Sequence, residues 1–268
     1  MSRLQQRFEK IKSEGSKALA AFITAGDPSL EATVALFREI EKNGADIVEL
    51  GVPFSDPLAD GPVIQASAQR ALKAGTTLKK IIALVSEIRK ESELPIVLMT
   101  SFNPVYVYGQ EAFVQDAAAA GVDGLIIPDL PPEEAETFQP IAEAKGIDLI
   151  FLLAPTSSDA RIQMIARRSR GFLYYISLTG TTGTRTALAT GLKEKMQAIR
   201  SQASLPALVG FGISSPEQAA EAAQVSDGVI VGSAIVKIIE KEGASAKGLE
   251  QVGQLVSAIK QAIAGPST

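Results

Sequence analysis

One carboxylate stands where a buried strand would ordinarily carry an apolar side chain. Glu49 lies in the apolar run 46–52, and alternate side chains of a strand face opposite sides. Val48 and Leu50 supply the side that packs on helices, so Glu49 is expected to point to the interior. Burial there would raise the pKa of its carboxyl toward the range of a general acid–base. A structural ion pair is the alternative, but the apolar runs of this chain contain no Lys or Arg.

The loop that follows, 53–62, contains three prolines and two further carboxylates, Asp56 and Asp60. Asp before proline commonly initiates a turn, so turn formation explains Asp56 equally well. Asp60 is kept as a second candidate for chemistry. Glu49, Asp56 and Asp60 together are an alternative Mg²⁺ site, but their spacing has no magnesium signature, and we expect no metal.

Three clusters of small residues near the carboxyl terminus predict a phosphate site. They occupy residues 180–183, 210–214 and 231–234, each at the end of an apolar run or just after it. Glycine lets backbone N–H groups approach an anion, and a helix beginning near Ser233 would point its positive end at that anion. Each cluster alone is weak evidence, because tight turns need glycine anyway. Since the clusters contain no Lys or Arg, the contacts are expected to come from the backbone.

The residue types that are absent narrow the chemistry. The 268 residues include no histidine and no cysteine, which excludes Ser-His-Asp triads, thiolate nucleophiles and disulfides. Acid–base work near neutral pH then falls to Asp, Glu, Lys or Tyr with shifted pKa values. The formal net charge of −4 argues against a nucleic-acid surface. The lack of cysteine fits a reducing cytoplasm, and no apolar stretch approaches the roughly 20 residues of a membrane span.

Eight short apolar runs, each followed by a helical pattern, predict the elements that position these groups. The runs are 18–24, 46–52, 95–101, 124–129, 148–154, 172–178, 206–212 and 228–233. Strict alternation implies parallel strands joined by right-handed crossovers. We therefore predict a (β/α)8 barrel that forms one domain over residues 1–268, with an extra amino-terminal helix within residues 1–15. A doubly wound sheet is the alternative, but no GxGxxG opens the first crossover.

Proline and the spacing of the runs refine this prediction. Asp27-Pro28 and Ser215-Pro216 each pair a capping side chain with proline and predict helix starts. The longest steps between strand starts are 49 residues, from 46 to 95, and 34 residues, from 172 to 206. Both insertions follow the carboxyl end of a strand, the face on which barrel active sites form.

Three motifs resemble the tryptophan synthase α-subunit family. Residues 49–62 read ELGVPFSDPLADGP, residues 210–214 read GFGIS and residues 232–237 read GSAIVK. The resemblance covers essentially the whole chain, and the fourteen-residue motif is highly specific. It implies a (β/α)8 barrel and a lyase of tryptophan biosynthesis. The implied reaction is retro-aldol cleavage of indole-3-glycerol phosphate to indole and glyceraldehyde 3-phosphate.

The resemblance also implies roles for particular residues. Glu49 would protonate indole C3 and take the proton of the glycerol hydroxyl as the carbon–carbon bond breaks. Asp60 would accept a hydrogen bond from the indole N–H and stabilise the positive charge that develops there. The residues implied for substrate binding are Phe22, Ser101, Ile126, Leu152, Tyr174 and Thr182. Those implied for phosphate binding are Gly183, Phe211, Gly212, Gly232 and Ser233.

A partner is implied as well. In the family, pyridoxal phosphate belongs to a β subunit, which receives indole through a channel in an α2β2 complex, and no cofactor is implied in this chain. Asp56, Asn103 and Pro104 match segments that face β. One departure lies nearby, because Ser101 stands where the family usually has tyrosine. Either the indole pocket lacks this aromatic wall, or Phe102 forms the wall in place of the tyrosine.

Three other functions remain open from the sequence. A stand-alone lyase would share the chemistry and release free indole. Another phosphate-binding barrel, an isomerase or epimerase, would need a different substrate pocket. A non-catalytic regulator would only bind and activate β, although retention of both Glu49 and Asp60 argues against it.

Overall fold

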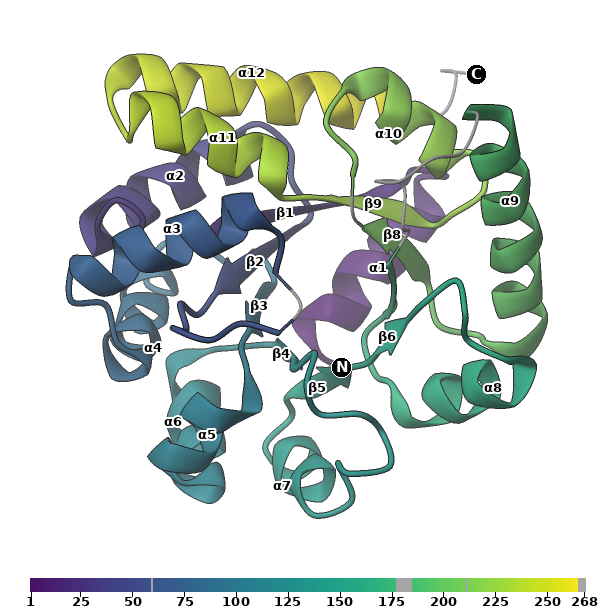
Figure 1. Ribbon diagram of the computed structural model, residues 1–268, viewed down its shortest axis with the longest axis horizontal. Coiled ribbons are helices and arrows are strands. Elements are labelled where there is room, and N and C mark those ends of the chain that lie inside the picture. Colours follow the sequence, from purple (N-terminus) through teal and green to yellow (C-terminus); the bar gives the residue numbers. More distant parts are fainter. Residues whose placement is uncertain (59, 177–184, 211, 265–268) are drawn as a thin grey trace.

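The strands of the protein close into a barrel, seen in the computed structural model of Figure 1. The structure describes residues 1–58, 60–176, 185–210 and 212–264. Their strands form one parallel sheet in the order β5-β4-β3-β2-β1-β9-β8-β7-β6. The two end strands, β5 (Asp148–Ile150) and β6 (Leu152–Leu153), are separated only by Phe151, so the sheet closes on itself. The predicted (β/α)8 barrel is confirmed.

Each predicted strand begins within one residue of its apolar run. The other strands are β1 (Ala18–Thr24), β2 (Ile47–Gly51), β3 (Ile96–Met99), β4 (Gly124–Ile126), β7 (Leu173–Ile176), β8 (Ala207–Gly210) and β9 (Gly228–Val231). The fifth predicted strand is interrupted at Phe151, whose N–H donates to the Ser169 hydroxyl at 3.3 Å instead of to a neighbouring strand.

Helices surround the barrel, as Figure 1 shows. They are α2 (Leu30–Lys42), α3 (Pro62–Lys73), α4 (Leu78–Ile88), α5 (Phe102–Tyr108), α6 (Gln110–Ala120), α7 (Phe138–Ala144), α8 (Asp159–Arg168), α9 (Arg185–Gln202), α10 (Pro216–Ala223), α11 (Ser233–Glu242) and α12 (Ala246–Ile263). The long step after β2 is filled by two helices, α3 and α4. None of the described helices combines the length and apolarity needed to cross a bilayer.

One of the two predicted helix starts is confirmed. Ser215 caps α10 and Pro216 is its first residue. The start at Asp27 is wrong, because Ser29 caps α2 through a 3.1 Å bond from the N–H of Ala32. The Asp27 carboxylate is buried instead against Arg70 of α3, at 2.8 Å.

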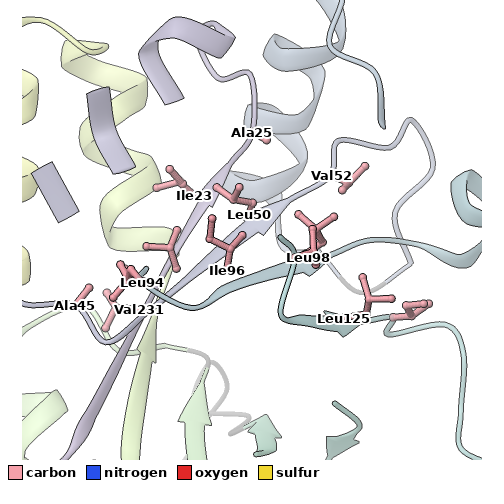
Figure 2. Close-up of a cluster of buried hydrophobic side chains, with 14 of the residues drawn as sticks. Ile23, Ala25, Ala45, Leu50, Val52, Leu94, Ile96, Leu98, Leu125 and Val231 are labelled. Carbon is pink, nitrogen blue, oxygen red and sulfur yellow. The ribbon is translucent and has the colours of Figure 1, made fainter. Parts of the chain in front are cut away.

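The apolar side chains form two layers, one on each side of the strands. The outer layer packs strand residues such as Ile23, Leu50 and Leu98 against the helices, and Figure 2 shows part of it. The inner layer fills the barrel and includes Ile47 and Val97. Because Val48 and Leu50 lie in the outer layer, Glu49 points into the barrel, as the alternation of β2 predicts.

Helix α1 (Arg3–Ser13) covers the amino-terminal end of the barrel. Its Leu4 and Ile11 belong to the inner apolar layer, and the ring of Phe8 lies 5.9 Å from that of Phe172. Arg3 reaches Asp123, just before β4, at 3.2 Å. The extra amino-terminal helix is therefore present, and it leaves the carboxyl ends of the strands as the open face.

Three aspartates reinforce the same closed end. Each precedes a strand, accepts a backbone N–H from the start of the neighbouring strand at 2.8–2.9 Å, and pairs with a cation. The aspartates with their N–H donors are Asp46 with Leu19, Asp123 with Ile96 and Asp227 with Ala207. The paired cations are Lys260, Arg89 and Arg200, respectively. These charges tie the strands together far from the open face.

Candidate active site

A pocket of about 810 Å³ lies at the carboxyl ends of the strands. Seven of the residues implied by the resemblance line it. They are Phe22, Asp60, Leu152, Tyr174, Gly212, Gly232 and Ser233. The fold thus brings together groups from β1, the loop after β2, β6, β7 and the turns that follow β8 and β9.

Glu49 is fully buried beside this pocket. It pairs in register with Phe22 of the adjacent strand, and Phe22 lines the pocket. Neither carboxylate oxygen has a hydrogen-bond partner in the described part of the chain. Burial alone raises the pKa of the Glu49 carboxyl to about 8. A carboxyl with this pKa is protonated at neutral pH and can donate a proton. Because no described residue pairs with its oxygens, the alternative of a structural ion pair for Glu49 is wrong.

Two further ionisable groups share this environment. Asp60 is half-buried, and burial raises the pKa of its carboxyl. Burial, followed by the negative charges of Glu49 and Asp60, raises the pKa of the Tyr174 phenol. Because charge effects of this kind act over short distances, these three groups converge on one region of the barrel.

Two glycines leave the space that the aromatic rings of Phe22 and Tyr174 occupy. A Cβ at Gly51 would lie 2.5 Å from Cζ of Phe22, and one at Gly210 would lie 2.6 Å from Cε1 of Tyr174. In both cases the glycine is on the strand next to the ring, so only the absence of a side chain permits the contact. Sequence reasoning placed Gly210 in a phosphate cluster and missed this packing role.

The end of the pocket at which the resemblance implies a phosphate is built from turns. Gly212 has φ +82, in the region that favours glycine, and Gly232 precedes α11, whose first residue is Ser233. Backbone N–H groups at the start of a helix suit an anion. The other residues implied for this end and its closure, Thr182, Gly183 and Phe211, lie outside the described residues.

Several lining residues were not anticipated from the sequence. They include the apolar side chains of Ile64, Met99, Pro128, Ile176 and Ile230. They also include Lys237, although no cation was expected here. Its position four residues after Ser233, on the same side of a helix, was the available signal.

Two residues implied for substrate binding are not among those that line this pocket. Ile126 is fully buried in the inner apolar layer. Ser101 lines a smaller cavity of about 30 Å³, which shares Asp60, Met99 and Pro128 with the main pocket. Phe102 packs edge-on against Phe138, with ring centroids 5.9 Å apart, and lines neither cavity. The interpretation that Phe102 supplies the missing wall is therefore wrong.

The segments implied to face a partner carry exposed apolar side chains. Leu58 is 86% exposed, Tyr106 66% and Val107 77%. Asp56 and Asn103 are exposed in the same segments, and Pro104 is half-exposed. The two segments adjoin, because Leu58 and Ser101 line the same small cavity.

Where the structure describes the chain, no cluster of three or more acidic residues could hold a metal ion, so Glu49, Asp56 and Asp60 do not form the alternative Mg²⁺ site.

Comparison with known proteins agrees with this arrangement. A family model described as tryptophan synthase alpha chain matches residues 8–264. The tryptophan synthase alpha chain of Geobacter sp. (strain M21) is 54% identical over 264 residues, which are 98% of each chain. That of Geobacter sulfurreducens is 53% identical over 263 residues, covering 98% of this chain and 99% of the relative.

Solved structures have the same fold. The crystal structure of tryptophan synthase subunit alpha from Legionella pneumophila str. Paris superposes with a TM-score of 0.91 at 42% identity and covers 98% of each chain. An open form of tryptophan synthase from M. tuberculosis gives a TM-score of 0.88 at 35% identity, with 98% of this chain and 99% of that chain covered. On the match over nearly its whole length, this chain belongs to the tryptophan synthase alpha chain family.

Proposed function

We propose that Glu49 and Asp60 carry out in this chain the reaction of its family. The chain is a carbon–carbon lyase that cleaves indole-3-glycerol phosphate to indole and glyceraldehyde 3-phosphate. The assignment of the acid–base role to Glu49 rests on one observation. Its carboxyl is buried, has no hydrogen-bond partner among the described residues and has a pKa raised to about 8.

The proposed reaction uses Glu49 twice. Its neutral carboxyl donates a proton to C3 of the indole ring, which places a positive charge on the ring nitrogen. The resulting carboxylate then takes the proton of the glycerol hydroxyl while the carbon–carbon bond breaks. The electrons of that bond return to the ring, the hydroxyl carbon becomes the aldehyde, and Glu49 regains its proton. A carboxyl whose pKa lies near the working pH suits both steps.

Asp60 has a separate proposed role at the ring nitrogen. Its carboxylate would accept a hydrogen bond from the indole N–H and stabilise the charge that protonation at C3 creates. Asp60 lines the pocket together with the rings of Phe22 and Tyr174, which offer an apolar surface to the indole. The position of Asp60 at the end of a proline-rich loop holds its backbone in place, and Gln65 donates to its carbonyl at 2.8 Å.

The phosphate group is proposed to bind at the other end of the pocket. Gly212, Gly232 and Ser233 would meet it with backbone N–H groups, supported by the positive end of α11. Thr182, Gly183 and Phe211 remain predicted contributors to substrate and phosphate binding.

Gly232→Val is expected to weaken binding of glycerol 3-phosphate by about tenfold or more, because a branched side chain would occupy the space where N–H groups meet the anion. Its Cβ would lie 3.2 Å from Cβ of Phe22, so the ring must also shift. The measurement is the inhibition constant of glycerol 3-phosphate. Gly191→Val, where a Cβ on α9 meets nothing within 4 Å, is the control for the added bulk. An unchanged inhibition constant would remove the phosphate site from this position.

Ser101→Tyr is expected to raise kcat/KM for indole-3-glycerol phosphate by about two- to tenfold, since an aromatic contact contributes about 0.5–1.5 kcal/mol beyond its burial. The ring is too large for the small cavity beside Met99, so it would extend toward the adjoining main pocket and restore a wall there. Steady-state kinetics of the variant and of Ser101→Ala would test this. A tyrosine variant no faster than the parent would show that the pocket is adapted to serine.

We further propose that the partner is a tryptophan synthase β subunit in an α2β2 complex in the cytoplasm. The β subunit would hold pyridoxal phosphate, and this chain would hold no cofactor. The exposed apolar side chains of Leu58, Tyr106 and Val107 support a docking surface there. Asp56, Asn103 and Pro104 lie in the same two segments and are its proposed polar and turn elements.

The decisive experiment offers indole-3-glycerol phosphate to the purified chain, with and without its cognate β subunit, and follows glyceraldehyde 3-phosphate. We expect slow cleavage by the chain alone and at least about tenfold stimulation by β, because docking would favour a closed site. Fast turnover with no response to β would favour a stand-alone lyase. Turnover in neither condition would favour a regulator without catalysis.

A further inference from the structure

Lys237 lies at the phosphate end of the pocket, on the second turn of α11. It follows Ser233 by four residues, so the two side chains share one face of the helix, about 6 Å apart along its axis. Side chains of a helix lean toward its amino terminus. The side chain of Lys237 therefore leans toward the turn at which the phosphate is proposed to bind.

The fold offers no structural reason for a cation at this position. Lys237 is exposed, and it makes no hydrogen bond or ion pair within the described ranges of the chain. The acids that follow it on α11 are engaged elsewhere, Glu240 with Arg70 at 3.1 Å and Glu242 with Lys247 at 3.0 Å. A positive charge near the amino end of a helix also gains nothing from the helix dipole.

Lys237 is also the one cationic side chain among the described residues that line the pocket, and Asp60 is the one acidic side chain there. A phosphate monoester carries close to two negative charges at neutral pH. We propose that Lys237 attracts the phosphate group of the substrate into the pocket and strengthens its binding at the start of α11. This inference rests on the proposed phosphate site, and it assigns Lys237 to substrate capture, not to the chemical step.

Attraction of this kind has a recognisable dependence on salt. The screening length is about 10 Å at 0.1 M ionic strength and about 3 Å at 1 M. Loss of the charge should therefore lower kcat/KM by about five- to tenfold at low ionic strength and by less than about twofold near 1 M salt. The effect should appear in KM and in the binding of glycerol 3-phosphate, with little change in kcat.

The test compares Lys237→Gln, Lys237→Arg and Lys241→Gln with the parent. Lys241 lies one turn further along α11, is 79% exposed and is not among the residues that line the pocket, so its glutamine variant makes the same change in net charge outside the site. Each variant is measured for the inhibition constant of glycerol 3-phosphate and for kcat and KM, at ionic strengths from about 0.02 to 1 M. The thermal unfolding midpoint reports whether the fold is retained.

We expect weaker, less salt-dependent binding for Lys237→Gln, near-parental values for Lys237→Arg and no effect of Lys241→Gln. Equal losses in the two glutamine variants would show a general effect of net charge and would overturn the inference. So would a loss in Lys237→Gln that persists at high salt. If the parent itself does not bind glycerol 3-phosphate, the proposed phosphate site fails and the inference fails with it. Parental binding with no change in Lys237→Gln overturns the inference alone.

Discussion

Replacing Glu49 by glutamine is expected to lower kcat for cleavage of indole-3-glycerol phosphate by about 10²–10⁴-fold, because the amide cannot donate or accept the proton that moves in the reaction. The amide keeps the size of the carboxyl. The oxygens of Glu49 make no hydrogen bond within the described ranges, so the exchange leaves no described partner behind. The rate of glyceraldehyde 3-phosphate release, with β present, is the measurement.

Two controls separate chemistry from binding and from general damage. The inhibition constant of glycerol 3-phosphate should be unchanged in Glu49→Gln, since the proposed phosphate contacts lie at the other end of the pocket. Glu194→Gln makes the same chemical change at an exposed position of α9 and should turn over like the parent. A Glu49→Gln enzyme with parental turnover would contradict the proposed mechanism.

In the parent, ionisation of Glu49 is expected to lower the free energy of unfolding by about 3–5 kcal/mol as the pH rises. Replacing Glu49 by glutamine should remove this change. The pKa of Glu49 is raised to about 8 in the folded chain, above the ordinary value of 4.5 that it regains on unfolding. Between these two values the folded state holds the proton more often than the unfolded state. The stabilising contribution of the neutral carboxyl is therefore complete below about pH 4.5 and is lost as the pH rises through 8.

This loss can be measured as a difference between variants. The free energy of unfolding in urea is determined for the parent, Glu49→Gln and Glu194→Gln from pH 5 to about 9. Other groups that titrate in this range contribute equally to all three and cancel. As the pH rises, the free energy of unfolding of Glu49→Gln should increase relative to that of the parent. The difference between Glu194→Gln and the parent should stay constant. Parallel curves for all three would mean that Glu49 is not held neutral by burial.

The sequence predicted the barrel and the direction of Glu49 for one physical reason. Alternation of side chains along a strand is local, so the apolar neighbours Val48 and Leu50 determine which way Glu49 points. The eight apolar runs, which are also local, located the strand starts to within one residue. Element boundaries of this kind depend on a few consecutive residues and can be predicted from one chain.

Features that depend on contacts between distant segments were not predictable in this way. The carboxylate of Asp27 was expected to cap a helix, but Arg70, 43 residues further along, binds it instead. Phe102 was a plausible pocket wall until its packing on Phe138 was known. Lys237 stands outside the glycine clusters, and only the direction of α11 brings it to the pocket. In each case the contact depends on which distant segments the closed barrel brings together, and a local sequence pattern does not contain that information.

The buried carboxyl of Glu49 lies in a chain that has neither histidine nor cysteine. Those two side chains ordinarily account for much of the proton exchange of a protein between pH 6 and 9. A proton that the protein releases or takes up in this range when a ligand enters the barrel therefore has few sources besides Glu49. Calorimetric titrations with a ligand that does not itself titrate, in two buffers that differ in ionisation enthalpy, would count that proton directly. The protonation state of one buried side chain can thus be followed by calorimetry without a label.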